Sequence, residues 1–301
     1  MTWQLTLAGL GVGILVGMTG MGGGSLMTPI LIILFGFDAK VAVGTDILHG
    51  AVFKSFGAVR HRMLGTVHAR LTFWMFLGSG PMSLLGVYAA SRMGDSSGVE
   101  SLEAKLVGAA LVLGGLGYLA KTFIRGGVQG SDAPFLLRRR DRLIAVTLGA
   151  TCGFVVGLTS VGSGTFFGLV MLLVFPLTAQ KIVGTDIFHA AALLWVAGIG
   201  HLVAGDVNLH AMGWLLIGSI PGILLGSQMS IGIPDRALRI AFAIILCLSG
   251  VKLLNVPHAS VIIVAALAAG AVVLSIYSFR QLYFRKPPAL PRGGTPGPEQ
   301  S

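Results

Sequence analysis

Residues 43–49 read Val-Gly-Thr-Asp-Ile-Leu-His and residues 183–189 read Val-Gly-Thr-Asp-Ile-Phe-His, so one pattern returns after 140 positions. The same offset extends in both directions without a gap, which chance does not plausibly produce. It predicts that the chain contains two copies of one unit. Further matched pairs are Gly13 and Gly153, Gly17 and Gly157, Thr19 and Thr159, Gly22 and Gly162, Gly24 and Gly164, His61 and His201, Gly65 and Gly205, Val67 and Val207, Pro81 and Pro221, and Gly86 and Gly226.

The composition predicts a membrane protein. Of 301 residues, 54% are hydrophobic and 11% are charged, whereas an ordinary soluble domain is about 25% charged. A bilayer core about 30 Å thick requires roughly 20 apolar residues for each spanning helix. Eleven apolar segments are expected, over 3–20, 25–37, 41–60, 70–91, 102–124, 143–160, 165–177, 181–203, 209–231, 236–255 and 259–279.

The charge distribution argues against nucleic-acid binding. The net charge is +10, but the basic residues are spread over the expected loops instead of forming one patch. Clusters within 138–142 and 280–292 are typical of cytoplasmic flanks under the positive-inside rule. The two cysteines, each alone in an apolar segment, indicate neither a disulfide nor a thiolate metal site. No cofactor is expected, and the first apolar segment lacks signal-peptide flanks and is expected to be retained.

These flanks also predict the topology. Both clusters are placed in the cytoplasm. Each unit has five segments, which is an odd number, so equivalent loops of the two copies face opposite sides and the second copy must be inverted. The expected fold is an all-α polytopic membrane protein with two inverted repeats, short broken or re-entrant helices and one extra C-terminal span. The expected divisions are a first membrane repeat over 1–125, a basic cytoplasmic loop over 126–142, a second repeat over 143–256, an extra transmembrane helix over 257–280 and a disordered cytoplasmic tail over 281–301.

The segments 25–37 and 165–177 are too short for a comfortable span, and each follows a glycine-containing break. Free N–H groups at a helix N-terminus carry partial positive charge, so the breaks predict an anion site. The alternative is that the glycines only allow a tight turn and close packing. The substrate-binding candidates are Gly22, Gly23, Gly24 and Ser25 in the first break, Gly162, Ser163, Gly164 and Thr165 in the second, and Thr45 and Thr185 in the following segments.

Asp46 and Asp186 are the two acidic residues placed inside expected spans. A carboxylate in hydrocarbon costs several kcal/mol, so such a residue is usually paired, protonated or functional. His49 and His189 follow at i+3, which places an imidazole beside each carboxylate and predicts proton coupling. Alternatively, each aspartate caps its own helix.

Lys54 has no second copy, because position 194 is leucine. Its side chain either snorkels to the cytoplasmic surface or points inwards and supplies positive charge for an anion. His61 and His201 lie further along the same segments, towards opposite membrane faces. They are candidates for gating or a secondary role.

These motifs together resemble the TauE/SafE family of sulfite exporters, over nearly the whole chain except the last span and tail. The resemblance implies a multi-pass carrier of the bacterial inner membrane. It further implies transport of sulfite, sulfoacetate or other small sulfur-containing or organic anions by a secondary mechanism. The residues that carry it are 17–25, 42–45, His61, Gly65, Val67, Pro81 and Gly86, with the second copies of most of these.

The chain departs from the family pattern at two places. Asp46 and Asp186 stand where serine is expected after Gly-Thr, and the second break has Gly162-Ser163-Gly164 where three glycines are expected. Two added carboxylates near an anion site either couple transport to protons or change the substrate to something cationic or neutral.

Three functions are therefore compared. The first is a secondary transporter of a small anion in the lipid bilayer, with proton coupling and a homo-oligomer left open. The second is a divalent-metal or other cation transporter using Asp46, His49, Asp186 and His189. The third is an intramembrane enzyme or accessory subunit, against which the absence of a nucleophile-base motif and of a His-Glu-X-X-His motif argues.

Overall fold

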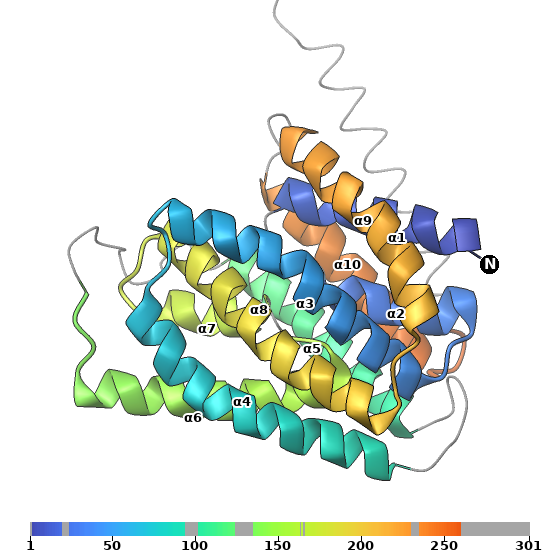
Figure 1. Cartoon of the computed structure of the whole chain (residues 1–301), viewed down its shortest axis with the longest axis horizontal. Coiled ribbons are helices and arrows are strands. Elements are labelled where there is room, and N and C mark those ends of the chain that lie inside the picture. Colours follow the sequence, from blue (N-terminus) through green and yellow to red (C-terminus); the bar gives the residue numbers. More distant parts are fainter. Residues whose placement is uncertain are drawn as a thin grey trace, which may run out of the picture. The chain divides into compact units, whose positions relative to one another are not determined.

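The computed structural model describes residues 2–19, 24–93, 102–123, 135–162, 164, 166–229 and 235–259. Within these ranges every regular element is a helix (Figure 1). The helices are α1 (Thr2–Thr19), α2 (Gly24–Phe35), α3 (Ala39–Met63), α4 (Ala69–Arg92), α5 (Leu102–Phe123), α6 (Arg139–Thr159), α7 (Phe166–Val174), α8 (Ala179–Ala204), α9 (Leu209–Met229) and α10 (Asp235–Leu253).

Each of the first ten apolar segments corresponds to one helix, with ends that differ by a few residues. The largest difference at a start is in α6, which begins at Arg139 instead of 143, where Asp141 Oδ2 accepts a hydrogen bond from the Arg138 backbone N–H and holds the first turn. The eleventh segment, the expected tail over 281–301 and most of the loop 126–142 lie outside the described residues.

Several helices have the length and apolar surface of membrane spans. Three are long and apolar enough by composition: α4, α6 and residues 180–204 of α8. Shorter apolar stretches lie in α1, α2, α9 and α10. Large hydrophobic side chains such as Leu34, Leu224 and Val203 point outwards, at 73%, 61% and 83% exposure. Such a surface is stable in lipid and is typical of a multi-pass membrane protein.

The short helices α2 and α7 each pack one face against the bundle. They have 12 and 9 residues, so at about 1.5 Å per residue neither crosses a bilayer core of about 30 Å. Met27 and Leu31 of α2 and Phe167 and Met171 of α7 are fully buried. Both short helices are therefore packed among longer ones.

The long helices pack in pairs through glycine. The pairs are α1 with α9, α4 with α6, α3 with α8 and α5 with α10, and Figure 1 shows α4 and α6 side by side. A Cβ at Gly149 of α6 would collide with the carbonyl oxygen of Met75 in α4, and one at Gly9 of α1 with that of Leu215 in α9. Glycine therefore brings two backbones into contact, as is usual where helices pack in lipid.

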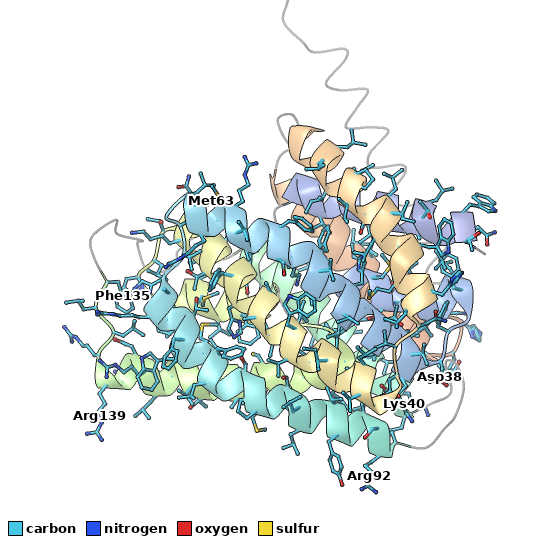
Figure 2. All side chains as sticks on the ribbon, viewed as in Figure 1. Asp38, Lys40, Met63, Arg92, Phe135 and Arg139 are labelled. Carbon is cyan, nitrogen blue, oxygen red and sulfur yellow. The ribbon has the colours of Figure 1, made fainter. Side chains whose placement is uncertain are left out.

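The helices α3 and α8 run antiparallel. Gly44 near the start of α3 abuts the backbone of Asp206 just after α8, and Gly184 near the start of α8 abuts Thr66 just after α3. These contacts are related by the 140-residue offset. In Figure 2, the labelled residues Asp38, Lys40 and Arg92 lie at one end of the bundle, and Met63, Phe135 and Arg139 lie at the other.

Candidate functional site

Asp46 is buried in the middle of the bundle, with 1% of its surface exposed. Its Oδ2 accepts hydrogen bonds from Thr28 Oγ1 at 2.6 Å, the Thr28 backbone N–H at 3.2 Å and Ser160 Oγ at 2.8 Å. Thr28 belongs to α2, and Ser160 directly follows α6. The carboxylate therefore joins a short helix of the first half to the break of the second.

The capping alternative for the two aspartates is wrong. The N-cap of α3 is Asp38, whose side chain accepts from the Lys40 N–H, and the N-cap of α8 is Thr178. Asp46 and Asp186 both lie well inside their helices. Their carboxylates are therefore intrahelical groups that must be stabilised by tertiary contacts.

Lys54 is also buried, at 4% exposure, so its side chain does not snorkel to the surface. It interacts electrostatically with both carboxylates, Asp186 and Asp46. Asp186 is 7% exposed. At the position equivalent to Thr28 stands Gly168, which has no hydroxyl to donate. The surroundings of Asp46 and Asp186 therefore differ at the position of Thr28.

His49 and His189, predicted to lie beside their aspartates, form side-chain hydrogen bonds across the two halves. His49 Nε2 is hydrogen-bonded to Ser219 Oγ of α9 at 2.8 Å, and His189 Nε2 to Ser79 Oγ of α4 at 2.9 Å. Residues at i+3 share a helix face, but a histidine ring is long enough to reach the helix packed against that face. The serine there supplies the partner.

Replacing Ser79 with alanine is expected to lower the free energy of unfolding by about 1–3 kcal/mol, because His189 Nε2 would remain buried without its partner. Thermal unfolding of the purified protein in detergent measures the change. Ser91→Ala is the matched control in the same helix, since Ser91 is exposed and bonds only the nearby Tyr88 carbonyl. An equal effect of both substitutions would contradict a structural role for the His189–Ser79 bond.

Thr45 and Thr185, expected to bind substrate, hold helix starts in place. Thr45 Oγ1 accepts the backbone N–H of Asn208 and Thr185 Oγ1 that of His68, both at 2.9 Å. Asn208 and His68 in turn cap α9 and α4 through their side chains. Both threonines are fully buried. Each hydroxyl oxygen is thus already engaged with the chain itself.

The second break is formed by residues with left-handed backbone. Ser160 ends α6 at φ 62°, and Gly162 and Gly164 follow at φ 121° and 109°. In this region only glycine is unstrained, so the two glycines allow the chain to turn between α6 and α7. Gly24 and Ser25 begin α2. The candidates Gly22, Gly23, Ser163 and Thr165 lie outside the described residues.

A small cavity opens beside Asp46, between α1, α3 and α9. Its polar lining comes from Asp46, His49 and Ser219, and the rest is apolar. Cys152 and Leu193 stand at the positions equivalent to Val12 and Phe53 of its wall, so the second half is shaped differently there. The lining residues are Val12, Val16, Asp46, His49, Gly50, Phe53 and Ser219.

Four side chains of this region were not predicted from the sequence: Thr28, Ser79, Ser160 and Ser219. Ser79 and Ser219 are separated by 140 positions and each precedes the matched Pro81 or Pro221 by two residues. The repeat therefore contained a signal for both serines. Thr28 and Ser160 have no hydroxyl-bearing equivalent, so nothing in the repeat distinguishes them.

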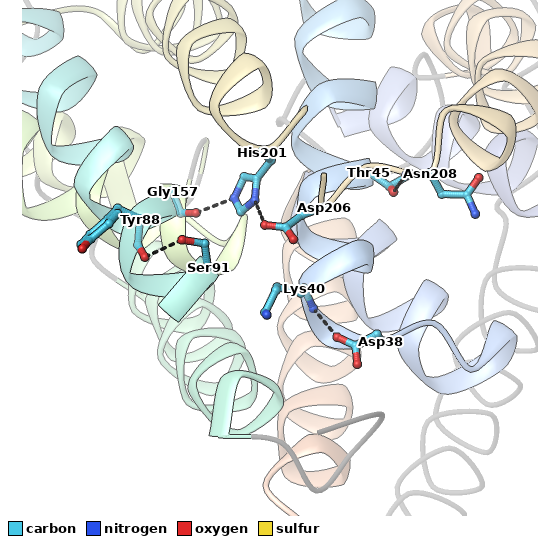
Figure 3. A network of polar contacts seen from close by, with 9 residues as sticks. All are labelled: Asp38, Lys40, Thr45, Tyr88, Ser91, Gly157, His201, Asp206 and Asn208. Atoms are coloured by element: carbon cyan, nitrogen blue, oxygen red, sulfur yellow. Dashed lines mark hydrogen bonds and ion pairs between the residues drawn. The ribbon is translucent and has the colours of Figure 1, made fainter. Parts of the chain in front are cut away.

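The gating candidates His61 and His201 lie near the ends of α3 and α8, away from the central carboxylates. His61 Nδ1 is hydrogen-bonded to Thr66 Oγ1 at 2.9 Å. His201 contacts Gly157 and Asp206 (Figure 3). Across the part of the chain that the structure describes, no three or more His, Cys, Asp or Glu side chains are grouped so as to hold a metal ion.

Comparison with known proteins adds a family and relatives. A family model described as sulfite exporter TauE/SafE matches residues 5–253. The probable membrane transporter protein YjnA of Bacillus subtilis is 35% identical over 84% of this chain and 100% of its own length. The probable membrane transporter proteins YdhB and YunE of the same organism are each 24% identical, over 81% and 83% of this chain and 96% of theirs. No solved structure matches the chain.

Proposed function

The chain belongs to the TauE/SafE sulfite exporter family, and from this premise we propose that it moves a small sulfur-containing or organic anion across the bacterial inner membrane, coupled to protons. It is a multi-pass membrane transporter of the bacterial cell membrane and not an enzyme. The observation that supports an anion substrate is Lys54, a buried lysine that interacts electrostatically with Asp46 and Asp186. A buried charge within a span is expensive and usually marks a transport pathway.

We further infer that the two halves are inverted repeats. The pairs α1 with α9 and α6 with α4 correspond under the 140-residue offset, as do the bonds His49–Ser219 and His189–Ser79. The antiparallel course of α3 and α8 fits a second copy of opposite orientation. Inverted repeats commonly place the substrate at their interface near the membrane midplane, where one repeat rocks against the other.

Charge balance supports the proton coupling. With both aspartates ionised and the histidines neutral, Asp46, Asp186 and Lys54 carry −2 and +1, a net charge of −1. An anion added to this group would raise the buried negative charge to −2, which is strongly unfavourable at low dielectric. Uptake of one proton by a carboxylate restores −1. The anion is therefore expected to enter together with a proton.

The two carboxylates are assigned different roles. Asp186 interacts electrostatically with Lys54 and has glycine at its equivalent of Thr28, so an anion that binds the Lys54 ammonium competes with it and leaves a carboxylate that takes up the proton. Asp46 is held by Thr28 and Ser160. It positions the break after α6 relative to α2 and leaves the proton transfer to Asp186.

The experiment begins with melting shifts of the purified protein in sulfite, thiosulfate, sulfonates, carboxylates and divalent metals, because a ligand of the folded state raises its stability. The anion with the largest shift is then followed in proteoliposomes with and without a pH gradient. Asp186→Asn is expected to abolish stimulation by the gradient. Asp46→Asn is expected to slow flux while stimulation persists.

Two results would contradict this proposal. One is flux that both asparagine variants leave unchanged in rate and in its response to the gradient. The other is the absence of any anion-induced melting shift in the wild-type protein.

A second candidate is cation transport, because the cavity beside Asp46 is lined by a carboxylate, an imidazole and a hydroxyl. These groups are able to ligate a divalent ion. Melting shifts with divalent metals and none with anions would favour this function. The variant Asp46→Asn is then expected to remove the metal-induced shift.

A further inference from the structure

A turn after α8 places a carboxylate against a buried histidine. Gly205 ends the helix at φ 84°, a left-handed conformation that suits glycine, and the Asp206 backbone N–H donates to the His201 carbonyl at 2.9 Å. The chain thereby folds back over the last turn of α8. Asp206 Oδ2 lies 3.5 Å from His201 Nδ1, and the His201 side chain is fully buried (Figure 3).

The other ring nitrogen fixes the position of one proton. His201 Nε2 lies 2.8 Å from the carbonyl oxygen of Gly157. A carbonyl oxygen only accepts, so Nε2 must carry a hydrogen. In a neutral ring the lone pair of Nδ1 would then face the Asp206 carboxylate. Neither Nδ1 nor Oδ2 has a hydrogen-bond partner elsewhere among the residues that the structure describes.

A proton between these two atoms removes the conflict. On Nδ1 it makes an imidazolium paired with the carboxylate, and on Oδ2 it makes a carboxylic acid that donates to Nδ1. Leaving both acceptors buried without a proton would cost about 1–3 kcal/mol for each group. A neutral His201 with an ionised Asp206 lacks this proton. The geometry therefore requires one additional proton on the pair.

The position of Gly157 favours the imidazolium. Gly157 lies in the last turn of α6, which ends at Thr159. Carbonyl groups at a helix C-terminus carry partial negative charge and stabilise a cation beside them. His201 therefore has a negative partner at each nitrogen.

Other titratable groups lie around Asp206 on the neighbouring helices. Glu103 of α5 is buried and interacts electrostatically with Lys40 of α3, with Asp206 and with Asp38 before α3. Figure 3 shows Lys40 between Asp206 and Asp38. On α4 and α9 the neighbouring charged or titratable groups are exposed and engaged with aromatic rings: Arg92 with Tyr88, and His210 with Trp214.

The first half of the chain contains the same turn without the carboxylate. Gly65 is left-handed at φ 69°, the Thr66 N–H donates to the His61 carbonyl, and Thr66 Oγ1 lies 2.9 Å from His61 Nδ1. A threonine hydroxyl can donate or accept, so His61 needs no extra proton there. The difference between Thr66 and Asp206 is therefore a difference in proton binding.

We propose that His201 and Asp206 form a proton-binding site that ties the end of α8 to the end of α6. Gly157 precedes Ser160 by three residues, and Ser160 donates to Asp46. Loss of the proton would bring the Nδ1 lone pair and the carboxylate into repulsion and free the end of α6 next to the break. The site is separate from the proton proposed for Asp186, and it stands or falls without it.

Nitrogen NMR of the full chain in nanodiscs, with histidine labelled at both ring nitrogens, tests this site. At pH 8 an ordinary histidine is neutral, because its pKa is about 6.5. His201, identified by the signals lost in His201→Gln, is expected to show two protonated nitrogens, whereas His61 shows one. Asp206→Thr, which copies Thr66, is expected to convert His201 to the neutral form.

Infrared spectra of the same protein with labelled aspartate test the other protonation state, in which the proton is on Asp206 Oδ2. A neutral His201 together with a carboxylic-acid band that disappears in Asp206→Thr would also support the site. A neutral His201 without such a band in the wild-type protein would overturn the proposal. The variants serve only to assign the signals, so Asp206→Asn replaces Asp206→Thr for the assignment of the band where Asp206→Thr does not fold.

Discussion

Replacing Lys54 with leucine, the residue at the equivalent position 194, is expected to reduce anion flux at least about tenfold. Removing a charge-assisted contact costs about 1.5–3 kcal/mol, and each 1.4 kcal/mol is about a factor of ten. The protein is still expected to fold, because Leu194 is itself buried in α8 and a carboxylate that loses its cation can be neutralised by a proton. The effect is measured as uptake into proteoliposomes of the anion that gives the largest melting shift.

The same substitution at an exposed lysine is the control for Lys54. Lys105→Leu on α5 removes one positive charge from an exposed position and is expected to leave flux near the wild-type value. Lys54→Arg is expected to retain part of the flux, since it keeps the charge but changes the geometry. Wild-type flux in folded Lys54→Leu would show that the substrate does not depend on the buried cation.

Replacing Gly9 with alanine is expected to lower the stability of the protein. A Cβ at Gly9 would collide with the carbonyl oxygen of Leu215 and lie 3.1 Å from its Cα. Backbone atoms cannot move aside as a flexible side chain can, so α1 and α9 must separate. Overpacking of this kind costs about 1–3 kcal/mol or more, which corresponds to a melting temperature lower by roughly 2–4 °C per kcal/mol.

A second glycine of the same helix provides the comparison. A Cβ at Gly11 meets nothing within 4 Å, and alanine is favoured over glycine in a helix by about 1 kcal/mol. Gly11→Ala is therefore expected to leave the melting temperature unchanged or raise it. If Gly9→Ala and Gly11→Ala unfold at the same temperature, the close approach of α1 and α9 is wrong.

The helices and the polar positions inside them were predictable because their signals are local. A run of apolar residues is readable in one window of sequence, and the short lengths of α2 and α7 follow from the same count. Asp46, Asp186 and Lys54 stand out for the same reason, as charges within such runs. The inverted repeat, read from the 140-residue offset, stays a prediction that the contacts support.

The partners of these polar groups were not predictable, because they come from distant parts of the chain. His49 and Ser219 are 170 residues apart, and Ser160 and Asp46 are 114 apart. The i+3 spacing indicated only that each imidazole lies beside its carboxylate, because this spacing describes a single helix. Packing of α3 against α9 and of α8 against α4 instead provides a serine for each Nε2.

The sequence by itself determined that this protein is a polytopic helical membrane protein, where its helices lie and which charges fall within apolar segments, since hydrophobic run length is a property of neighbouring residues. Only the tertiary structure decided that Lys54 points inwards, that Thr45 and Thr185 are used to hold helix starts, and that Asp206 reaches His201. These outcomes depend on which helices the glycines allow to approach, and that is settled by packing in three dimensions.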